Sequence, residues 1–204
     1  AAGLHGAGPG QCARQALSRQ TILHIALRVA VHTIPGALQG VPALLRLFDE
    51  FKIRASFVFS LGPDCTAHAW ADTLPPWLGG RLPAPAISDR AGDTLRAVAA
   101  AGHEVGISAY APGRWQNGVA FRGEAWTRGD VITAVNRFQQ IFSDRPRLYA
   151  GWGWQINTHL LKLQEELGFN YASDVRGRYV FLPVLQGRCF QCPQIPATLP
   201  TLDE

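Results

Sequence analysis

The chain has 204 residues, of which 47% are hydrophobic and 17% are charged. This size and apolar content suffice for one well-buried domain, and no apolar run approaches the ~20 residues of a membrane-spanning helix. The net charge of +4 comes from scattered arginines, without the basic run or zinc-finger spacing of a nucleic-acid-binding protein. The positive charge indicates a mildly basic surface or a site for an anion such as a phosphate head group.

The N-terminal segment differs from the rest of the chain. Residues 1–20 are rich in Gly and Ala, and no acidic residue precedes Asp49. The segment lacks the apolar core of a secretory signal, and the chain contains no Met. We expect a flexible or processed tail over residues 1–20, or the remnant of a transit sequence, and one domain over residues 21–204. The sequence leaves the location open between the cytoplasm and the periphery of a membrane or an assembly, and it shows no secretory signal.

Apolar runs and helical periodicity predict strands and helices that alternate along the chain. The predicted strands are Thr21–Val31, Ile53–Leu61, His103–Ser108, Leu148–Gly151, Phe169–Ser173, Tyr179–Leu182 and Gln194–Ala197. The predicted helices are Gly36–Phe51, Ser88–Ala101, Trp126–Phe142 and Asn157–Leu167, with Ser88 and Asn157 as N-caps. We expect loops over Leu74–Ala86 and Tyr110–Arg122.

This alternation predicts an α/β fold built from parallel β-α-β units. Many short strands with helices outside them favour a β/α barrel over a doubly wound sheet. No G-x-G-x-x-G motif follows a strand, so a dinucleotide loop is not expected.

Several sequence blocks occur in an order that identifies a family. They are Leu27–Thr33, Ala55–Asp64, His103–Gly106, Ala150–Trp152, Phe169–Asp174 and Gln194–Glu204. Together they resemble the NodB-type polysaccharide deacetylases, and most closely the branch that deformylates 4-deoxy-4-formamido-L-arabinose-phosphoundecaprenol. The resemblance runs over about residues 25–204. It implies a distorted (β/α) barrel, here C-terminally shortened, with its site at the C-terminal mouth of the strands.

The resemblance also implies metal-assisted hydrolysis of an N-acyl sugar. In that family a divalent metal is held by one Asp and two His, a second Asp takes the proton of water, an Arg orients this base, and a late His protonates the amine. The segment with the late His would follow Asp203-Glu204, where this chain ends.

This chain departs from the family at each of these positions. The base Asp falls on Ala30, the metal Asp on His32, the two metal His on Ser108 and Pro112, and the orienting Arg on Gly153. A methyl group accepts no proton, and proline has no side-chain donor atom. We therefore expect a catalytically inactive domain without a metal, used as a binding, structural or accessory subunit. The alternative is a metal-dependent amide hydrolase with relocated groups, using Zn²⁺ or another divalent cation on an N-acylated amino sugar or sugar lipid.

Six residues near the expected mouth are candidates for ligand binding. They are Thr33, Tyr110, Trp115, Trp152, Asp174 and Arg176. Aromatic rings stack on sugars, so a carbohydrate or sugar lipid is one candidate ligand, while core packing and a protein interface are the alternatives. Asp174 and Arg176 could also pair with each other.

Two histidines and two cysteines leave further alternatives open. His32 and His103 are expected near the mouth, either as ordinary hydrogen-bonded side chains or around a metal. Cys189 and Cys192 form a C-x-x-C motif, which fits packed or exposed thiols, a redox pair or half of a zinc site.

Overall fold

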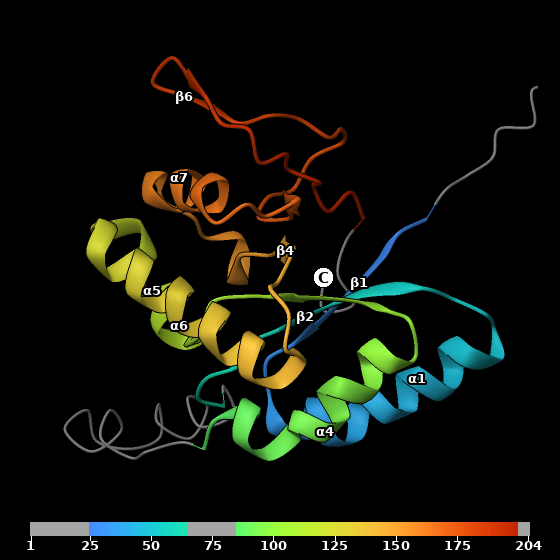
Figure 1. The fold of residues 1–204 in the computed structure, drawn as a ribbon. Coiled ribbons are helices and arrows are strands. Elements are labelled where there is room, and N and C mark those ends of the chain that lie inside the picture. Colours follow the sequence, from blue (N-terminus) through green and yellow to red (C-terminus); the bar gives the residue numbers. More distant parts are fainter. Residues whose placement is uncertain (1–24, 65–84, 200–204) are drawn as a thin grey trace, which may run out of the picture.

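Five parallel strands form the centre of the fold in the computed structural model, which describes residues 25–64 and 85–199 (Figure 1). They are β1 (Leu27–Val31), β2 (Ala55–Phe59), β3 (Glu104–Ile107), β4 (Leu148–Tyr149) and β5 (Tyr171–Ala172). Their order in the sheet, β1-β2-β3-β4-β5, equals their order in the sequence. This is the arrangement that successive right-handed β-α-β units produce around a barrel.

Helices connect the strands. The π-helical turn η1 (Gly36–Gly40) continues into α1 (Val41–Glu50), and later connections contain α4 (Ile87–Ala100), α5 (Pro112–Gly118), η2 (Val119–Phe121), α6 (Glu124–Phe142), η3 (Trp152–Trp154) and α7 (Thr158–Glu166). A hairpin of β6 (Val184–Leu185) and β7 (Arg188–Cys189) follows β5. In the described ranges, no helix is both long and apolar enough to span a membrane.

One face of the sheet packs against the helices. Phe57 and Phe59, alternate residues of β2, are both fully buried. They share the main core with Phe48 of α1, Leu95 of α4 and Phe138 of α6. Burying these rings removes apolar surface from water at roughly 25 cal/mol per Å², which is the main force that fixes the helices on this face.

The opposite, inner face carries polar side chains and a small apolar cluster of Val58, Leu148 and Ala150. Arg28 pairs in register with Ser56, and Ser56 with Glu104, so the three side chains lie on the same face. Gly106 occupies the centre of β3 on this face. A Cβ built there would lie 2.6 Å from the backbone oxygen of Leu148, so only glycine permits this approach of β3 to β4.

The sheet curls until its two edges approach each other. The Arg28 guanidinium on β1 donates to the backbone oxygen of Ser173, just after β5, at 2.6 Å. In a flat sheet, four gaps of ~4.8 Å would hold these edges roughly 19 Å apart, beyond the reach of an arginine. The expectation of a distorted β/α barrel agrees with this curvature, although in the described residues no strand pairing joins β1 to β5.

Two local predictions were wrong. Residues 110–122, predicted as a loop, contain α5 and η2, because Pro112 suits a first helical turn and Trp115 and Val119 are buried four residues apart. Ser88 is not the N-cap of α4, which is Ala86. The N-cap prediction for α7 is confirmed, since the Asn157 side chain accepts from the Leu160 N–H at 3.0 Å.

The chain after β5 also differs from the prediction. Residues 179–182 are not a strand, and the hairpin forms further on, around a tight turn in which Gln186 and Gly187 have φ of 50° and 78°. Residues 194–197 make only isolated bridges, such as Ala172 with Gln194. The predictions for residues 1–24, most of the loop over residues 74–86, and residues 200–204 lie outside the described residues.

Candidate active site

A row of residues marks the carboxyl end of the sheet. His32, Ser60, Ser108, Ala150 and Ser173 each directly follow a strand. Backbone hydrogen bonds align them: Ser60 N–H donates to the Val31 oxygen at 3.0 Å, and Ser108 N–H donates to the Phe59 oxygen at 2.9 Å. Side chains of one row point to the same face of a parallel sheet, so His32, Ser60 and Ser108 face the inside of the curl.

His32 is the imidazole of this row. Its Nδ1 lies 2.7 Å from Ser60 Oγ, and its ring meets the Trp152 ring edge-on at 3.9 Å between centroids. Burial, and then the positive charge of Arg28, lower the pKa of His32 from 6.5 to about 3. The ring is therefore neutral near pH 7, and with Nδ1 used by Ser60 only Nε2 is left for a ligand.

Arg28 brings a positive charge to the same mouth. It donates to the backbone oxygen and to Oγ of Ser173 at 2.6 and 2.9 Å, and it lies 4.5 Å above the ring of Trp154. Burial lowers the pKa of Arg28, while the charge of Asp174 raises it. Within the described ranges, its hydrogen bonds go to neutral oxygens, so the guanidinium retains a charge that can face an anion.

The loop that carries the tryptophans is held in an unusual conformation. Gly153 and Trp154 both have positive φ, 63° and 59°, a region that favours glycine and costs a tryptophan conformational energy. Trp152 Nε1 donates to Gln116 Oε1 at 2.9 Å, which fastens the loop to α5. The sequence comparison predicts the family's orienting arginine at Gly153, where a side chain would be strained.

Asp174 is a buried carboxylate behind this loop. It accepts from the Gly151 N–H at 2.6 Å, Gln164 Nε2 at 2.7 Å and Gln194 Nε2 at 3.0 Å. Burial raises its pKa, and these hydrogen bonds and Arg28 oppose that rise. Asp174 therefore positions the start of the 151–154 loop, and its fully buried side chain does not face a ligand.

Four other residues were predicted to bind a ligand, and each of them has a different environment in the structure. Thr33 Oγ1 accepts from the Gly36 N–H at 3.0 Å, and Tyr110 is held by a hydrogen bond from its N–H to Asp130 Oδ2 at 2.8 Å. Trp115 is fully buried, so its ring belongs to the core. Arg176 is exposed, and its guanidinium lies 5.7 Å from the Trp154 ring, on which Arg28 also lies.

The residues at the mouth do not fit a divalent metal. In the described parts of the chain, no three His, Cys, Asp or Glu side chains come together as a ligand set. Ser108 Oγ is buried without a hydrogen-bond partner, and Pro112 lies buried in the first turn of α5. Ala30 is exposed on the inner face and offers only a methyl group.

The expectation that His103 lies near the mouth together with His32 is wrong. It precedes β3, whereas His32 follows β1, so the two imidazoles lie at opposite ends of the sheet, roughly 16 Å apart at ~3.3 Å per residue. His103 Nδ1 accepts from the Ala55 N–H at 3.3 Å. The two histidines cannot share a metal.

The two cysteines of the C-x-x-C motif are free thiols in this structure, Cys189 exposed and Cys192 buried. Burial raises the pKa of Cys192 to about 12, so this thiol stays protonated. The arrangement fits a packed and an exposed thiol.

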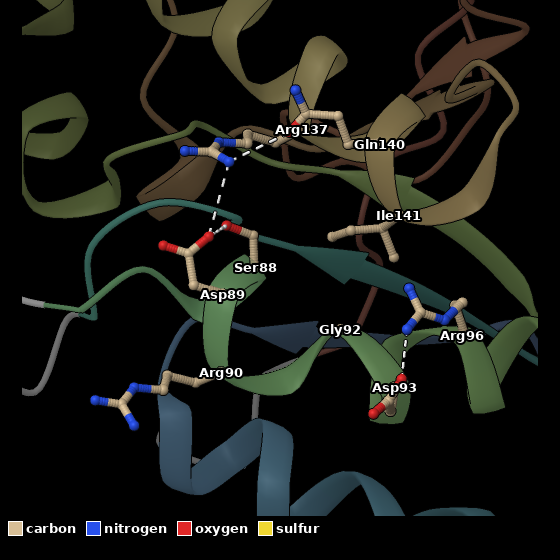
Figure 2. Close-up of a pocket in the computed structure, with 9 residues that line it drawn as sticks. All are labelled: Ser88, Asp89, Arg90, Gly92, Asp93, Arg96, Arg137, Gln140 and Ile141. Atoms are coloured by element: carbon tan, nitrogen blue, oxygen red, sulfur yellow. Dashed lines mark hydrogen bonds and ion pairs between the residues drawn. The ribbon is translucent and has the colours of Figure 1, made fainter.

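A polar groove of about 340 Å³ lies away from the mouth, between α4 and α6 (Figure 2). Its acidic groups have partners: Asp89 faces Arg137 at 3.7 Å, and Asp93 pairs with Arg96. Figure 2 shows Arg90 pointing away from these pairs. The acidic side chains of the groove are already paired with arginines of the same chain. We therefore place the candidate site at the carboxyl ends of the strands.

Comparison with known proteins decides the family. No family model matches the chain. A protein of Shewanella sediminis (strain HAW-EB3) is 31% identical over 212 residues, which cover 92% of this chain and 67% of that protein. It is named probable 4-deoxy-4-formamido-L-arabinose-phosphoundecaprenol deformylase ArnD.

The chain belongs to the NodB-type polysaccharide deacetylase family, near its ArnD branch. An equally named protein of Wigglesworthia glossinidia brevipalpis is 28% identical over 189 residues, 83% of this chain and 66% of its own length. A solved structure from Mycobacterium smegmatis, assigned to the polysaccharide deacetylases, shares the fold with a TM-score of 0.61 and 21% identity, covering 85% of this chain and 58% of that one.

These relatives correct the expected function. Both ArnD proteins carry the name of an enzyme, which contradicts the expectation of a catalytically inactive binding or accessory subunit and favours the alternative of an amide hydrolase. This family member spans about two thirds of the length of the two ArnD relatives.

Proposed function

We propose that this protein is an amide hydrolase that removes a formyl or other small acyl group from an amino sugar carried on a lipid phosphate. The observation that supports this most strongly is the 31% identity over 92% of the chain to a protein named as a deformylase of such a substrate. The inner strand-end mouth, with an imidazole, a guanidinium and two indole rings, offers groups that suit a sugar phosphate.

Hydrolysis requires one water molecule and the amide bond of the substrate to lie together at this mouth. The oxygen of water attacks the acyl carbon, the C–N bond breaks, and the amine leaves after gaining a proton. A divalent metal would supply a Lewis acid for this step, as in the family, but the described residues do not fit one. Proton transfer falls to His32, the imidazole of the strand-end row.

His32 can carry out this transfer in one tautomer. With Nδ1 protonated and donating to Ser60 Oγ, Nε2 keeps a lone pair that accepts the proton of water and then returns it to the leaving nitrogen. Trp152 packs against the ring and fixes its orientation. The low pKa of His32 makes it a weak base, so a slow reaction is expected.

Arg28 and Trp154 supply binding rather than proton transfer. The Arg28 guanidinium donates to neutral oxygens of Ser173 and can pair with the phosphate of the substrate. The indole face of Trp154, already covered by Arg28, positions that charge at the mouth. Arg28 should therefore act on the KM for a phosphate-bearing substrate, while His32 should act on kcat.

The two roles are separated by kinetics with an N-formyl amino-sugar lipid phosphate. We expect Arg28→Gln to raise KM about tenfold or more, since charge-assisted hydrogen bonds contribute ~1.5–3 kcal/mol. We expect His32→Ala to lower kcat by about 10²-fold, the low end of the usual contribution of a general base, because its pKa is low. His159→Ala on α7, the matched histidine control, should change neither. Equal activity of the His32→Ala and His159→Ala proteins would remove His32 from the reaction.

A further inference from the structure

The side chains at the strand-end mouth are shielded from solvent in this structure. His32 is 8% exposed, and Ser60, Ser108 and Ser173 are 0%, 1% and 7% exposed. A ligand of the size of a sugar cannot contact this row while the side chains stay covered. One of the segments around the mouth must therefore move before His32 can act on any ligand.

Two of these segments are held by several hydrogen bonds. After β1, the Ala37 N–H donates to the Thr33 oxygen at 2.9 Å, and Ala37 is fully buried. After β3, the N–H groups of Tyr110 and Ala111 donate to the carboxylate of Asp130 at 2.8 and 3.3 Å. Movement of either segment would break partly buried hydrogen bonds, so neither is expected to open easily.

The segment after β4 is fixed at its two ends. The Gly151 N–H donates to Asp174 Oδ1 at 2.6 Å, and Trp115 Nε1 donates to the backbone oxygen of Gln155 at 2.8 Å. Both Asp174 and Trp115 are fully buried. The residues between these two anchors, 152–154, are half-buried or exposed. We therefore expect movement in this segment to be confined to residues 152–154.

Trp152 is the residue of this segment that covers His32. The two rings meet edge-on with 3.9 Å between their centroids, and Trp152 is half-buried while His32 is almost completely buried. The imidazole is thus shielded by a ring that itself reaches solvent. A side chain with solvent beside it has room to turn away, which a fully buried ring such as Trp115 does not have.

Gln116 of α5 holds Trp152 in this position. Trp152 Nε1 donates to Gln116 Oε1 at 2.9 Å, and this hydrogen bond is exposed to solvent. Gln116 also lies against Gly153, where a built Cβ would be 3.4 Å from the Gln116 side chain. Water can replace either partner of an exposed hydrogen bond, so breaking it costs little free energy. The contact between Trp152 and Gln116 is therefore weak enough to open reversibly.

We propose that the Trp152 side chain is a gate over His32 and that Gln116 is the latch that keeps this gate closed. With the latch formed, His32 is shielded from solvent, as in this structure. When Trp152 Nε1 leaves Gln116 Oε1, the indole turns outward and His32 Nε2 becomes open to water or a ligand. Gln116 is a positioning residue, since it touches Trp152. The gate goes beyond the proposed hydrolysis, because it controls access to His32 whatever ligand is bound.

Acylation by diethyl pyrocarbonate measures access to His32 in the whole chain without any sugar lipid, so its outcome is independent of hydrolysis. The reagent transfers an ethoxycarbonyl group to the free nitrogen of a neutral imidazole, with release of ethanol and carbon dioxide. Peptide mass spectrometry then gives the rate at each histidine. Near neutral pH we expect His32 to react at least about tenfold more slowly than the half-buried His159 of α7.

Variants of the latch and of the gate should change this rate by different amounts. Gln116→Ala removes the acceptor of Trp152 Nε1 and should raise the His32 rate about fivefold. Gln116→Glu keeps an oxygen acceptor at the same place, so its rate should stay within about twofold of that of the unchanged protein. Trp152→Ala removes the gate itself and should raise the rate at least about tenfold.

The matched control is Gln140→Ala on α6. It also removes an exposed hydrogen bond, which Gln140 Oε1 accepts from Arg137 at 3.2 Å, and it should leave the His32 rate unchanged. His103 is the internal reference, because it is also 8% exposed and should react at the same rate in every variant. Circular dichroism establishes that each variant is folded.

Three results would overturn the proposal. The first is a His32 rate in the unchanged protein that equals the rate of His159. The second is the same His32 rate in Gln116→Ala as in Gln140→Ala or in Gln116→Glu, because the hydrogen bond would then not hold the gate. The third is an equal rise at His32 and His103, which would indicate a general loosening of the fold.

Discussion

The Arg28 guanidinium donates to both the backbone oxygen and the hydroxyl of Ser173, at 2.6 and 2.9 Å. One residue lies on the first strand of the sheet and the other just after the last, 145 positions later in the chain. The contact joins the two edges of the curled sheet at its mouth. It therefore contributes to the shape of the barrel and to the charge of the candidate site at once.

Loss of this contact should destabilise the fold. We expect Arg28→Ala to lower the free energy of unfolding by about 1.5–3 kcal/mol, the usual contribution of hydrogen bonds from a charged group. Urea unfolding followed by circular dichroism measures it. Arg90→Ala, on the exposed side of α4, is the control and should stay within about 0.5 kcal/mol. Equal midpoints for the two variants would show that the edges hold together without Arg28.

Asp174 should be one of the most sensitive positions of the chain. Asp174→Ala leaves the Gly151 N–H and the amides of Gln164 and Gln194 without their acceptor in a buried site. Each unmatched buried donor costs about 1–3 kcal/mol, so we expect a total loss of at least ~3 kcal/mol. Thermal unfolding measures it, with Asp144→Ala at the exposed end of α6 as control. A stable Asp174→Ala protein would mean that water replaces the carboxylate.

Ser108 gives a prediction of the opposite sign. Its hydroxyl is buried and, in the described structure, has no hydrogen-bond partner. Ser108→Ala removes this unmatched group and should raise the free energy of unfolding by about 1 kcal/mol. Ser60→Ala is the comparison, because it leaves His32 Nδ1 without its 2.7 Å partner and should destabilise. Destabilisation by Ser108→Ala would indicate an undetected partner at the mouth.

The sequence predicted the architecture because the architecture depends on patterns along the chain. Alternating apolar runs and helical periodicity predicted parallel β-α-β units, and Asn157 as an N-cap predicted the start of α7. The segment with α5 was missed because Gly113, Asn117 and Gly118 hide the helical spacing of its buried side. A propensity argument cannot see that Trp115 fills the core.

The site was less predictable, because it depends on contacts between distant strands. The sequence identified His32 and Ser108 through the family positions, but it gave no sign that Ser60 would meet His32 or that Arg28 would reach Ser173. One signal was present: Arg28 and His32 are four apart on a strand, an even spacing that puts both on one face. His103 is far from His32 because His103 precedes β3 and His32 follows β1, which puts the two residues at opposite ends of the parallel sheet.

The stability of the fold should depend on pH through His32. Its pKa is about 3 in the folded chain against the ordinary value of 6.5 in the unfolded chain, so between these values the unfolded chain binds a proton that the folded chain does not. The contribution of neutral His32 to the free energy of unfolding is therefore fully present above pH 6.5. It decreases as the pH falls towards about 3, by up to about 1.4 kcal/mol per pH unit. Urea midpoints of the unchanged protein and His32→Gln measure the difference. Parallel pH profiles for the two proteins would contradict a buried neutral imidazole.

The release of formate tests the account most directly. Purified protein is incubated with an N-formyl amino-sugar lipid phosphate, both with a chelator and with added Zn²⁺, and formate and the free amine are measured together. We predict equal amounts of formate and amine above the rate without protein, and a reduction by about 10²-fold in His32→Ala. Formate at the background rate under both conditions would contradict the proposal that this family member is an amide hydrolase.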